Sequence, residues 1–297
     1  MPRPAIVTEG YRVLLGTTRL PVPRGARVTF PGVEAAARAG STEHFDVYFD
    51  EVLGESGRFV ASTVLNRAER DLNTLQRWFG TTQLPDRRER VVLARLPEDA
   101  RARRSGTGDA VLYCDVETVP RLEALQSCFY VGLLVAGRFV AAHDHWDAGS
   151  SDGDALARVL ATAMYPRRII GFATAWTWLE GERADFVHAT GAPDNPQAIG
   201  CAVLFLNYLH HQLGYSWQEI VASGSTTLAA TARSLGADEP GYEAYDEFRA
   251  LVDGHFPAGE VVALETDNPF PFEPPTARNP SQAASSGLVT ADGPSSN

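Results

Sequence analysis

The sequence has little cysteine, no CxxC pair and no excess of positive charge, and each shortage argues against a class of protein. Three cysteines occur in 297 residues, Cys114, Cys128 and Cys201, which is too few for a disulfide-stabilised scaffold. One bridge between Cys114 and Cys128, or buried thiols, would both fit this number. Without a CxxC pair, a zinc site built from thiolates is not expected. The net charge of -11 argues against a nucleic acid partner, because phosphates are bound by basic surfaces.

The chain also lacks the hydrophobic runs that mark secretion signals and membrane spans. Its first residues, Met1–Gly16, contain no apolar core of a secretory signal. The longest apolar run, Phe129–Ala142, is interrupted by Gly132, Gly137 and Arg138, so no window reaches the length of a bilayer span. The sequence therefore predicts a soluble protein, cytoplasmic by default, that does not act at a membrane.

The hydrophobic pattern divides the chain into an α/β block and a helical lobe, which predicts an α+β fold. A hydrophobic content of 44% is enough for a sizeable core. The Arg-, Pro- and Gly-rich residues 1–43 are expected to form an extended arm. The α/β block would cover 44–147 and the all-helical lobe 148–275. From 276 to 297 small and polar residues dominate, which predicts a disordered tail.

The elements of the α/β block follow from residue periodicity. Alternation in HFDVYFD predicts a strand over 44–50, and apolar residues at three- and four-residue steps predict a long helix that ends at Gly80. Further elements are expected as strands over 90–97 and 110–116 and a short helix over 119–127. The apolar stretch from Cys128 to His143 can be read as a hairpin around Ala136–Gly137 or as one buried strand with a bulge.

The lobe is predicted to begin with a helix over Gly153–Met164. Asp152 or Ser151 would cap its first turn, and Pro166 would end it. Other helices are expected over 167–180, 198–213, 216–223, 227–235 and 242–256. The helices at 153–164 and 198–213 have comparable apolar faces, so we expect them to pack together with a cleft at the mouth between them.

Two stretches carry a resemblance to a known family. Asn195–Ile220 reads NPQAIGCAVLFLNYLHHQLGYSWQEI and resembles a set of actinobacterial zincin-like proteins. The HFDVYFD strand, the WFG end of the long helix and the TDNPFPF stretch are similar to the same set, so the resemblance covers roughly 44–272. Together with Gly149–Pro166, the second stretch looks like the two central helices of gluzincin metallopeptidases. The resemblance implies a zincin-like fold.

The residues that make a gluzincin catalytic are missing. These enzymes need HExxH on one helix, so that two histidines bind zinc and the glutamate polarises the metal-bound water. The matching position reads GDALA, which puts Asp154 in place of the glutamate and leaves Gly153 and Ala157 in place of the histidines. No glutamate ligand stands at Gln197–Cys201. The resemblance therefore implies a pseudoenzyme without a metal cofactor, and Asp154 is the one candidate catalytic residue.

A remaining group of polar residues is HDHWD, from His143 to Asp147. Two histidines two positions apart in an extended segment point to one side, so His143 and His145 could hold zinc with Asp147 or Asp154. A polar loop at the mouth of the cleft is the simpler interpretation. On that interpretation the candidates for the binding cleft are His143, Asp144, His145, Asp147, Asp154 and Arg158.

Three functions are open on this reading. The leading hypothesis is a non-catalytic module that binds a peptide or protein segment in the cleft. The alternative is a metal-dependent hydrolase with a non-standard site of His143, His145, Asp147 and Asp154. The third is a structural or assembly protein. A serine-hydrolase elbow GxSxG and a nucleotide-binding GxxxxGK[ST] loop are both absent from the sequence.

Overall fold

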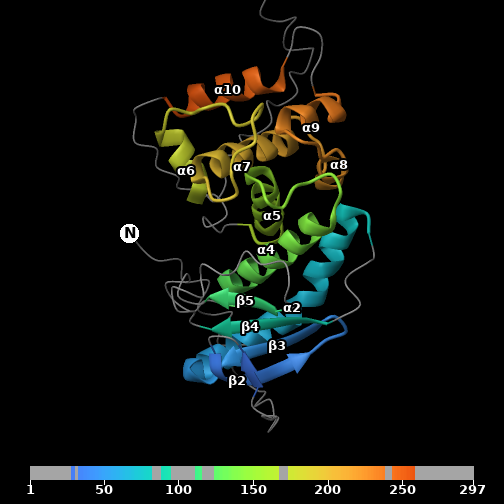
Figure 1. The fold of residues 1–297 in the computed structure, drawn as a ribbon, viewed down its shortest axis with the longest axis vertical. Helices are drawn as coiled ribbons and strands as arrows, with labels where there is room; N and C mark the ends of the chain where they lie inside the picture. Colours follow the sequence, from blue (N-terminus) through green and yellow to red (C-terminus); the bar gives the residue numbers. More distant parts are fainter. Residues whose placement is uncertain are drawn as a thin grey trace, which may run out of the picture.

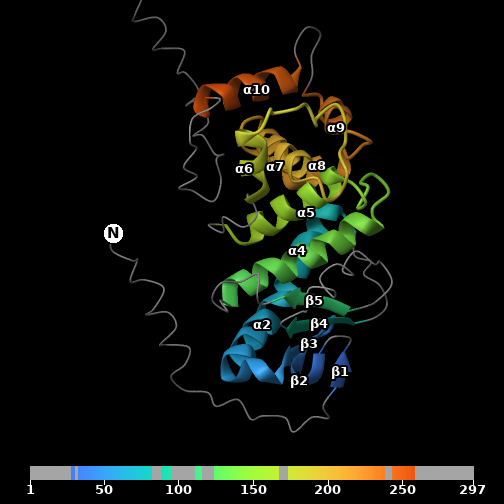
Figure 2. The same ribbon diagram turned by 60° about the vertical axis from the view of Figure 1, so that its left-hand side comes forward.

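The computed structural model places a sheet at one end of an elongated molecule and a stack of helices at the other (Figures 1 and 2). It describes residues 28–30, 33–81, 88–94, 111–115, 124–166, 173–237 and 243–257. The predicted α+β fold, a small α/β block followed by a helical lobe, is confirmed. Residues 1–27 of the predicted arm, the NPFPF stretch and the predicted tail over 276–297 lie outside the described residues.

The sheet has five strands in the order β1-β2-β3-β4-β5. The strands are β1 (Val28–Phe30), β2 (Val33–Ser41), β3 (Phe45–Asp50), β4 (Glu89–Ala94) and β5 (Val111–Asp115). The first three form an antiparallel meander, whereas β4 and β5 run parallel to β3. The prediction of an extended arm over 1–43 is wrong for residues 33–41. These residues form β2, and most of β2 is paired with β3.

The long helix α2 (Gly54–Phe79) connects β3 to β4 as the crossover of a parallel pair. A 3-10 turn, η1 (Glu51–Leu53), precedes it. The helix buries one stripe, which includes Val60, Val64, Leu72 and Leu75. It ends as predicted at Gly80, whose φ of 63° is the left-handed conformation that favours glycine.

The prediction for the stretch after Ser127 is wrong, because it is a single helix, α4 (Ala124–Ala142). Gly132 does not break this helix. It permits close packing, since a Cβ there would lie 3.1 Å from Met164 Cε of the next helix. By length and composition α4 could cross a bilayer. The sequence analysis had excluded this because Gly132, Gly137 and Arg138 interrupt the apolar run. About half of the helix (56%) is buried against the rest of the protein, as in the core helix of a soluble fold.

The remaining helices form the lobe (Figure 1). They are α5 (Ser151–Met164), α6 (Ala173–Glu180), α7 (Pro196–His211), α8 (Trp217–Ala222), α9 (Leu228–Leu235) and α10 (Ala244–His255). α7 lies at the centre, and every residue from Ala198 to Leu209 is buried. One hydrophobic cluster runs from Phe45 in β3 to Val252 in α10. The α/β block and the lobe therefore share one core, which continues across the predicted boundary at 147/148.

A buried arginine fastens α10 to the loop that follows α6. The side chain of Arg183 is 3% exposed, and the φ of this residue is 52°. Its guanidinium donates to the carbonyl oxygens of Leu179 at 2.9 Å and Phe256 at 2.6 Å, and to Asp253 Oδ1 at 2.6 Å. All five N–H groups of a guanidinium point outward in one plane, so this one side chain can bond at once to the end of α6 and to the end of α10.

Candidate functional site

The start of α5, to which the sequence resemblance assigned the position of the HExxH motif, is a packed turn. Ser150 is the N-cap, one residue before the two predicted candidates, and its Oγ accepts from the backbone N–H of Gly153 at 3.3 Å. The same hydroxyl donates to the Asp147 carbonyl oxygen at 2.7 Å. These two bonds hold the preceding loop against the first turn of α5.

Gly153, which the sequence analysis matched to the first histidine of HExxH, has no room for a side chain. An added Cβ would lie 2.2 Å from the Asp147 carbonyl oxygen and 3.0 Å from Ala148 Cα. Both neighbours are backbone atoms, which cannot move aside as the end of a flexible side chain could. The backbone of the 147–148 turn therefore occupies the space that any side chain at position 153 would need.

Asp154, the candidate catalytic carboxylate, is paired within its own helix. Arg158 Nε donates to Asp154 Oδ2 at 2.5 Å, an i,i+4 pair that leaves both side chains partly exposed. This arrangement fits a surface ion pair on the first turns of α5.

The HDHWD segment forms a turn between α4 and α5 and is anchored by its tryptophan. Trp146 is buried, and its Nε1 donates to the Val221 carbonyl oxygen of α8 at 2.9 Å. Asp144, His145 and Asp147 on either side of it are exposed. The segment therefore presents two carboxylates and an imidazole to solvent on a fixed backbone.

His143 and His145 lie beside each other, with ring centroids 5.2 Å apart. Burial lowers the pKa of His143, and the neighbouring His145 lowers it further. Its Nδ1 accepts from the backbone N–H of His145 at 3.4 Å, so the neutral ring carries its proton on Nε2. In this arrangement neither ring nitrogen of His143 offers a lone pair to a metal. Across the described ranges, no three His, Cys, Asp or Glu side chains gather at a metal-binding distance.

The residue that the sequence interpretation missed is Asp152, whose carboxylate is 4% exposed. Its Oδ1 lies 3.1 Å from Ser151 Oγ and its Oδ2 lies 3.0 Å from Thr190 Oγ1. Burial raises the pKa of Asp152 to about 6 and the nearby charge of Asp147 adds to the rise, while the bonds from Thr190 and Ser151 oppose it. Asp152 was proposed only as a cap, because its partner Thr190 is 38 residues away in the chain.

The cleft predicted between α5 and α7 is filled where the two helices meet. Their facing residues, such as Leu156, Leu160 and Val203, are fully buried, and the helices pack directly together. At the N-terminal ends of the two helices, the Ser151 N–H donates to the Gly191 carbonyl oxygen at 3.1 Å. A Cβ on Gly191 would lie 2.4 Å from Ala198 Cβ, so this loop closes the mouth.

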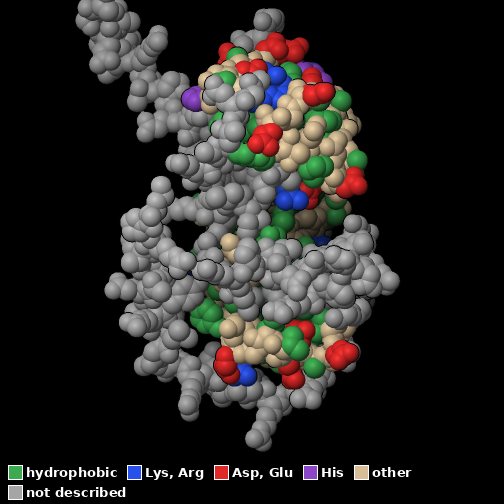
Figure 3. Space-filling view, turned by 90° about the vertical axis from the view of Figure 1, so that its left-hand side faces the viewer, with side chains coloured by type: hydrophobic (Ala, Val, Ile, Leu, Met, Phe, Trp, Pro, Cys, Tyr) green, Lys and Arg blue, Asp and Glu red, His purple; other side chains and the backbone are tan. Residues whose placement is uncertain are grey.

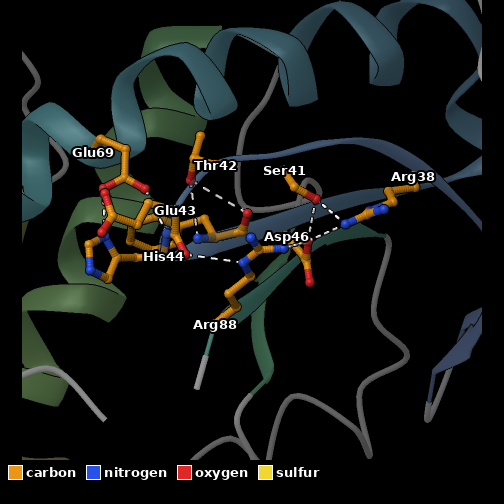
Figure 4. Close-up of polar contacts among 9 residues, drawn as sticks. Arg38, Ser41, Thr42, Glu43, His44, Asp46, Glu69 and Arg88 are labelled. Atoms are coloured by element: carbon orange, nitrogen blue, oxygen red, sulfur yellow. Dashed lines mark hydrogen bonds and ion pairs between the residues drawn. The ribbon is translucent and has the colours of Figure 1, made fainter. Parts of the chain in front are cut away.

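A second polar cluster lies at the turn between β2 and β3 (Figure 4). The Glu69 carboxylate of α2 accepts from the His44 backbone N–H at 2.8 Å and faces His44 Nδ1 at 2.9 Å. On the other side of the turn, Arg38 and Ser41 both bond to Asp46. Burial raises the pKa of Glu69, but bonds from Thr42 and His44 outweigh it and lower the pKa overall.

The lowered pKa of Glu69 gives a stability prediction for this turn. A group whose pKa is depressed by folding stabilises the protein above its unfolded pKa and loses that effect as pH falls through the folded value. At pH 6 we expect Glu69→Gln to lower the free energy of unfolding by about 0.5–1 kcal/mol, since the pair is partly exposed. In urea titrations the difference should shrink below about pH 4.

The matched control for Glu69→Gln is Glu55→Gln in the same helix. Glu55 is 85% exposed and pairs only with Arg58 three residues away, so the expected change is within about 0.3 kcal/mol. Equal effects of the two variants at pH 6 would contradict the assignment of Glu69 as the anchor of the turn.

Cys128 and Cys201 are buried thiols. Burial raises the pKa of each to about 12, so both are protonated at neutral pH and unsuited to nucleophilic attack.

Cys128 lines a cavity of about 10 Å³ between α2 and α4, which has room for about one water molecule. Asp71 borders the same cavity and accepts from Tyr165 and Arg70. Cys114 and Cys128 are not joined by a disulfide.

Comparison with known proteins yields no family model, no curated protein and no solved structure that matches the chain.

Proposed function

We propose that the protein is a non-catalytic module that binds a peptide or protein segment, built on a zincin-like plan from which the metal site has been removed. The observation that carries the proposal is the packing of Gly153. The Asp147 carbonyl oxygen would lie 2.2 Å from a Cβ at Gly153, so backbone closes the position that the resemblance assigns to the first ligand. The pairing of Asp154 with Arg158 supports the same proposal, because the remaining candidate carboxylate is engaged.

The proposed docking surface is the exposed part of the HDHWD segment with the first turn of α5 beside it. Trp146 fixes the backbone, while Asp144, His145 and Asp147 face solvent. Two exposed carboxylates favour a basic partner, and the net charge of -11 would attract one over a distance. Acidic side chains also lie near both ends of the molecule on the face drawn in Figure 3. We place the protein in the cytoplasm, with a partner that is neither nucleic acid nor membrane.

The binding proposal predicts that peptides selected on the full-length protein from a random displayed library are basic. We expect Asp144→Asn/Asp147→Asn to weaken their binding about fivefold in fluorescence polarisation, because two exposed ion pairs contribute about 1 kcal/mol. The asparagine at 147 can still accept from the Gly149 N–H, now 2.7 Å from Asp147 Oδ1, so the turn is kept.

The control for this experiment is Asp194→Asn/Glu247→Gln, which removes the same charge from exposed positions elsewhere. Its affinity should stay within about twofold of the parent protein. Acidic or apolar peptides, or equal losses in the two double variants, would count against this docking surface. Failure to select any peptide would favour the structural or assembly role.

The alternative, a metal-dependent hydrolase, rests on the neighbouring rings of His143 and His145. Zinc binding there requires His143 to give up its bond from the His145 backbone N–H. Plasma mass spectrometry of the purified protein separates the two functions. The binding proposal predicts far less than one zinc per chain. About one equivalent of zinc that disappears in His143→Ala/His145→Ala would overturn it and make peptide hydrolysis the next assay.

A further inference from the structure

Asp185 holds the imidazole of His188 from one side. Its Oδ1 accepts from the backbone N–H groups of Val187 at 2.9 Å and His188 at 3.0 Å, and its Oδ2 lies 2.7 Å from His188 Nδ1. An ionised carboxylate can only accept, so the hydrogen in the last contact belongs to Nδ1. The ring of Tyr245 packs edge-on against the imidazole, with ring centroids 5.3 Å apart. A neutral His188 therefore keeps the lone pair of Nε2 on the edge away from Asp185.

Glu243 faces the other nitrogen of the same ring, with its Oε2 3.5 Å from His188 Nε2. Glu243 is the N-cap residue of α10, the helix farthest from the sheet (Figure 1), but its side chain makes no capping hydrogen bond to that helix. The carboxylate is directed instead towards the loop between α6 and α7. An imidazole lone pair and a carboxylate oxygen thus converge on one point, and both attract a cation.

We propose that His188 Nε2 and Glu243 Oε2 are two ligands of a zinc-binding site that joins the loop between α6 and α7 to the start of α10. Zinc is bound by imidazole nitrogen and carboxylate oxygen at about 2.0–2.2 Å, so two such ligands of a tetrahedral ion are about 3.4 Å apart. The separation of 3.5 Å needs almost no adjustment. Asp185 acts as the carboxylate that orients a zinc-binding histidine through its other ring nitrogen. The site uses no residue of the HDHWD segment and does not rest on the proposed function.

The site has two protein ligands, and water completes the coordination. Asp185 bonds to the opposite edge of the ring, and among the residues that the structure describes no third His, Cys, Asp or Glu converges there. Both ligand side chains are open to solvent, His188 at 39% and Glu243 at 60%. An imidazole ligand suits zinc, whereas magnesium and calcium take oxygen ligands. An ion held by two exposed side chains exchanges readily, so the site is tested by titration rather than by the metal content of the purified protein.

Zinc at this position gives α10 a second attachment to the same loop. Arg183 bonds to Asp253 and to the Phe256 carbonyl oxygen, which holds the C-terminal end of the helix. His188 and Glu243 lie at its N-terminal end. The ion therefore fixes both ends of α10 to the segment between α6 and α7, and its binding is expected to slow the local opening of that helix.

The test is a calorimetric titration of zinc into the metal-free, untagged full-length protein. We expect saturable binding that is lost in His188→Gln and weakened by about tenfold or more in Glu243→Gln. Asp185→Asn tests the orientation of the ring. Its oxygen still accepts from the two backbone N–H groups, but its NH2 group faces Nδ1 and so favours the ring proton on Nε2. We expect this variant to bind zinc about 10–100-fold more weakly.

The matched control is Glu247→Gln, which removes the same charge from an exposed position one turn further along α10. Its affinity for zinc should stay within about twofold of the parent protein. His143→Ala/His145→Ala should also keep the binding, because the site uses neither ring. Hydrogen exchange locates the ion: zinc should slow exchange in the first two turns of α10 in the parent protein and leave His188→Gln unchanged.

The proposal is overturned if the parent protein shows no saturable zinc binding, which is the result expected if His188 and Glu243 form only an ion pair. It is also overturned if either His188→Gln or Asp185→Asn binds zinc as the parent does. Loss of the binding in His143→Ala/His145→Ala would overturn it as well, and would support the metal-dependent hydrolase. The failure of this proposal is thus distinguished from the failure of the proposed function.

Discussion

Gly153→Ala is expected to destabilise the protein by about 2–4 kcal/mol, although alanine is the better helix former. Alanine in place of glycine inside a helix gains about 1 kcal/mol in the absence of contacts. At position 153 the new methyl group would lie 2.2 Å from the Asp147 carbonyl oxygen and 2.9 Å from its carbonyl carbon. The 147–148 turn must then move away from α5, and overpacking against backbone is costly. Urea unfolding followed by circular dichroism measures the change.

Gly137→Ala in α4 is the matched control for Gly153→Ala, because a Cβ at Gly137 meets nothing within 4 Å. This variant should be neutral or stabilise the protein by up to about 1 kcal/mol. Opposite signs for the two glycines would identify the contact, rather than helix propensity, as the cause. A Gly153→Ala protein as stable as Gly137→Ala would remove the main support for the proposed function, since a ligand side chain could then be accommodated there.

Arg183→Met is expected to have a comparable effect, a loss of about 3 kcal/mol in the free energy of unfolding. Methionine keeps much of the side-chain volume, but the carbonyl oxygens of Leu179 and Phe256 lose the Arg183 donor. Asp253 loses its ion pair with Arg183 and keeps the one with Arg249 at 3.4 Å. Breaking a buried ion pair costs about 3–5 kcal/mol, and the half-exposed Asp253 puts this pair at the lower end. Hydrogen exchange should locate the damage in α10 and the loop after α6.

Arg233→Met is the control for Arg183→Met, because Arg233 is exposed in the last turn of α9. Its expected change is within about 0.5 kcal/mol. If both variants unfold at the same urea concentration, Arg183 does not fasten α10 in the way its three bonds indicate.

Elements with a strong helical period could be predicted from the sequence, and those that depend on a neighbour could not. The pattern of α2 and its Gly80 cap placed the end of that helix correctly. The β2 strand reads VEAAARAGS, and alanine has little preference for strands, so it is a strand because β3 pairs with it. In α4 almost every residue is apolar, so helical and strand periods cannot be told apart.

The same distinction applies to the candidate site. Local spacing placed Gly153 and Asp154 on the first turn of α5, which the structure confirms. It could not reveal that Gly153 faces the Asp147 carbonyl or that Asp152 meets Thr190, because both contacts depend on where a loop packs. The cleft was predicted from two apolar faces, but such faces pack against each other as readily as they border a groove.

The hydrophobic core that runs without a break from β3 to α10 has a consequence for how such a chain can change by recombination. An exchange of the helical half at residue 147 would separate α4 from α5, and would leave Trp146 without the Val221 carbonyl and Tyr165 without Asp71. Neither half can be inherited as a portable unit. Change is tolerated instead at exposed turns such as Pro193–Asp194, where an insertion disturbs no buried side chain.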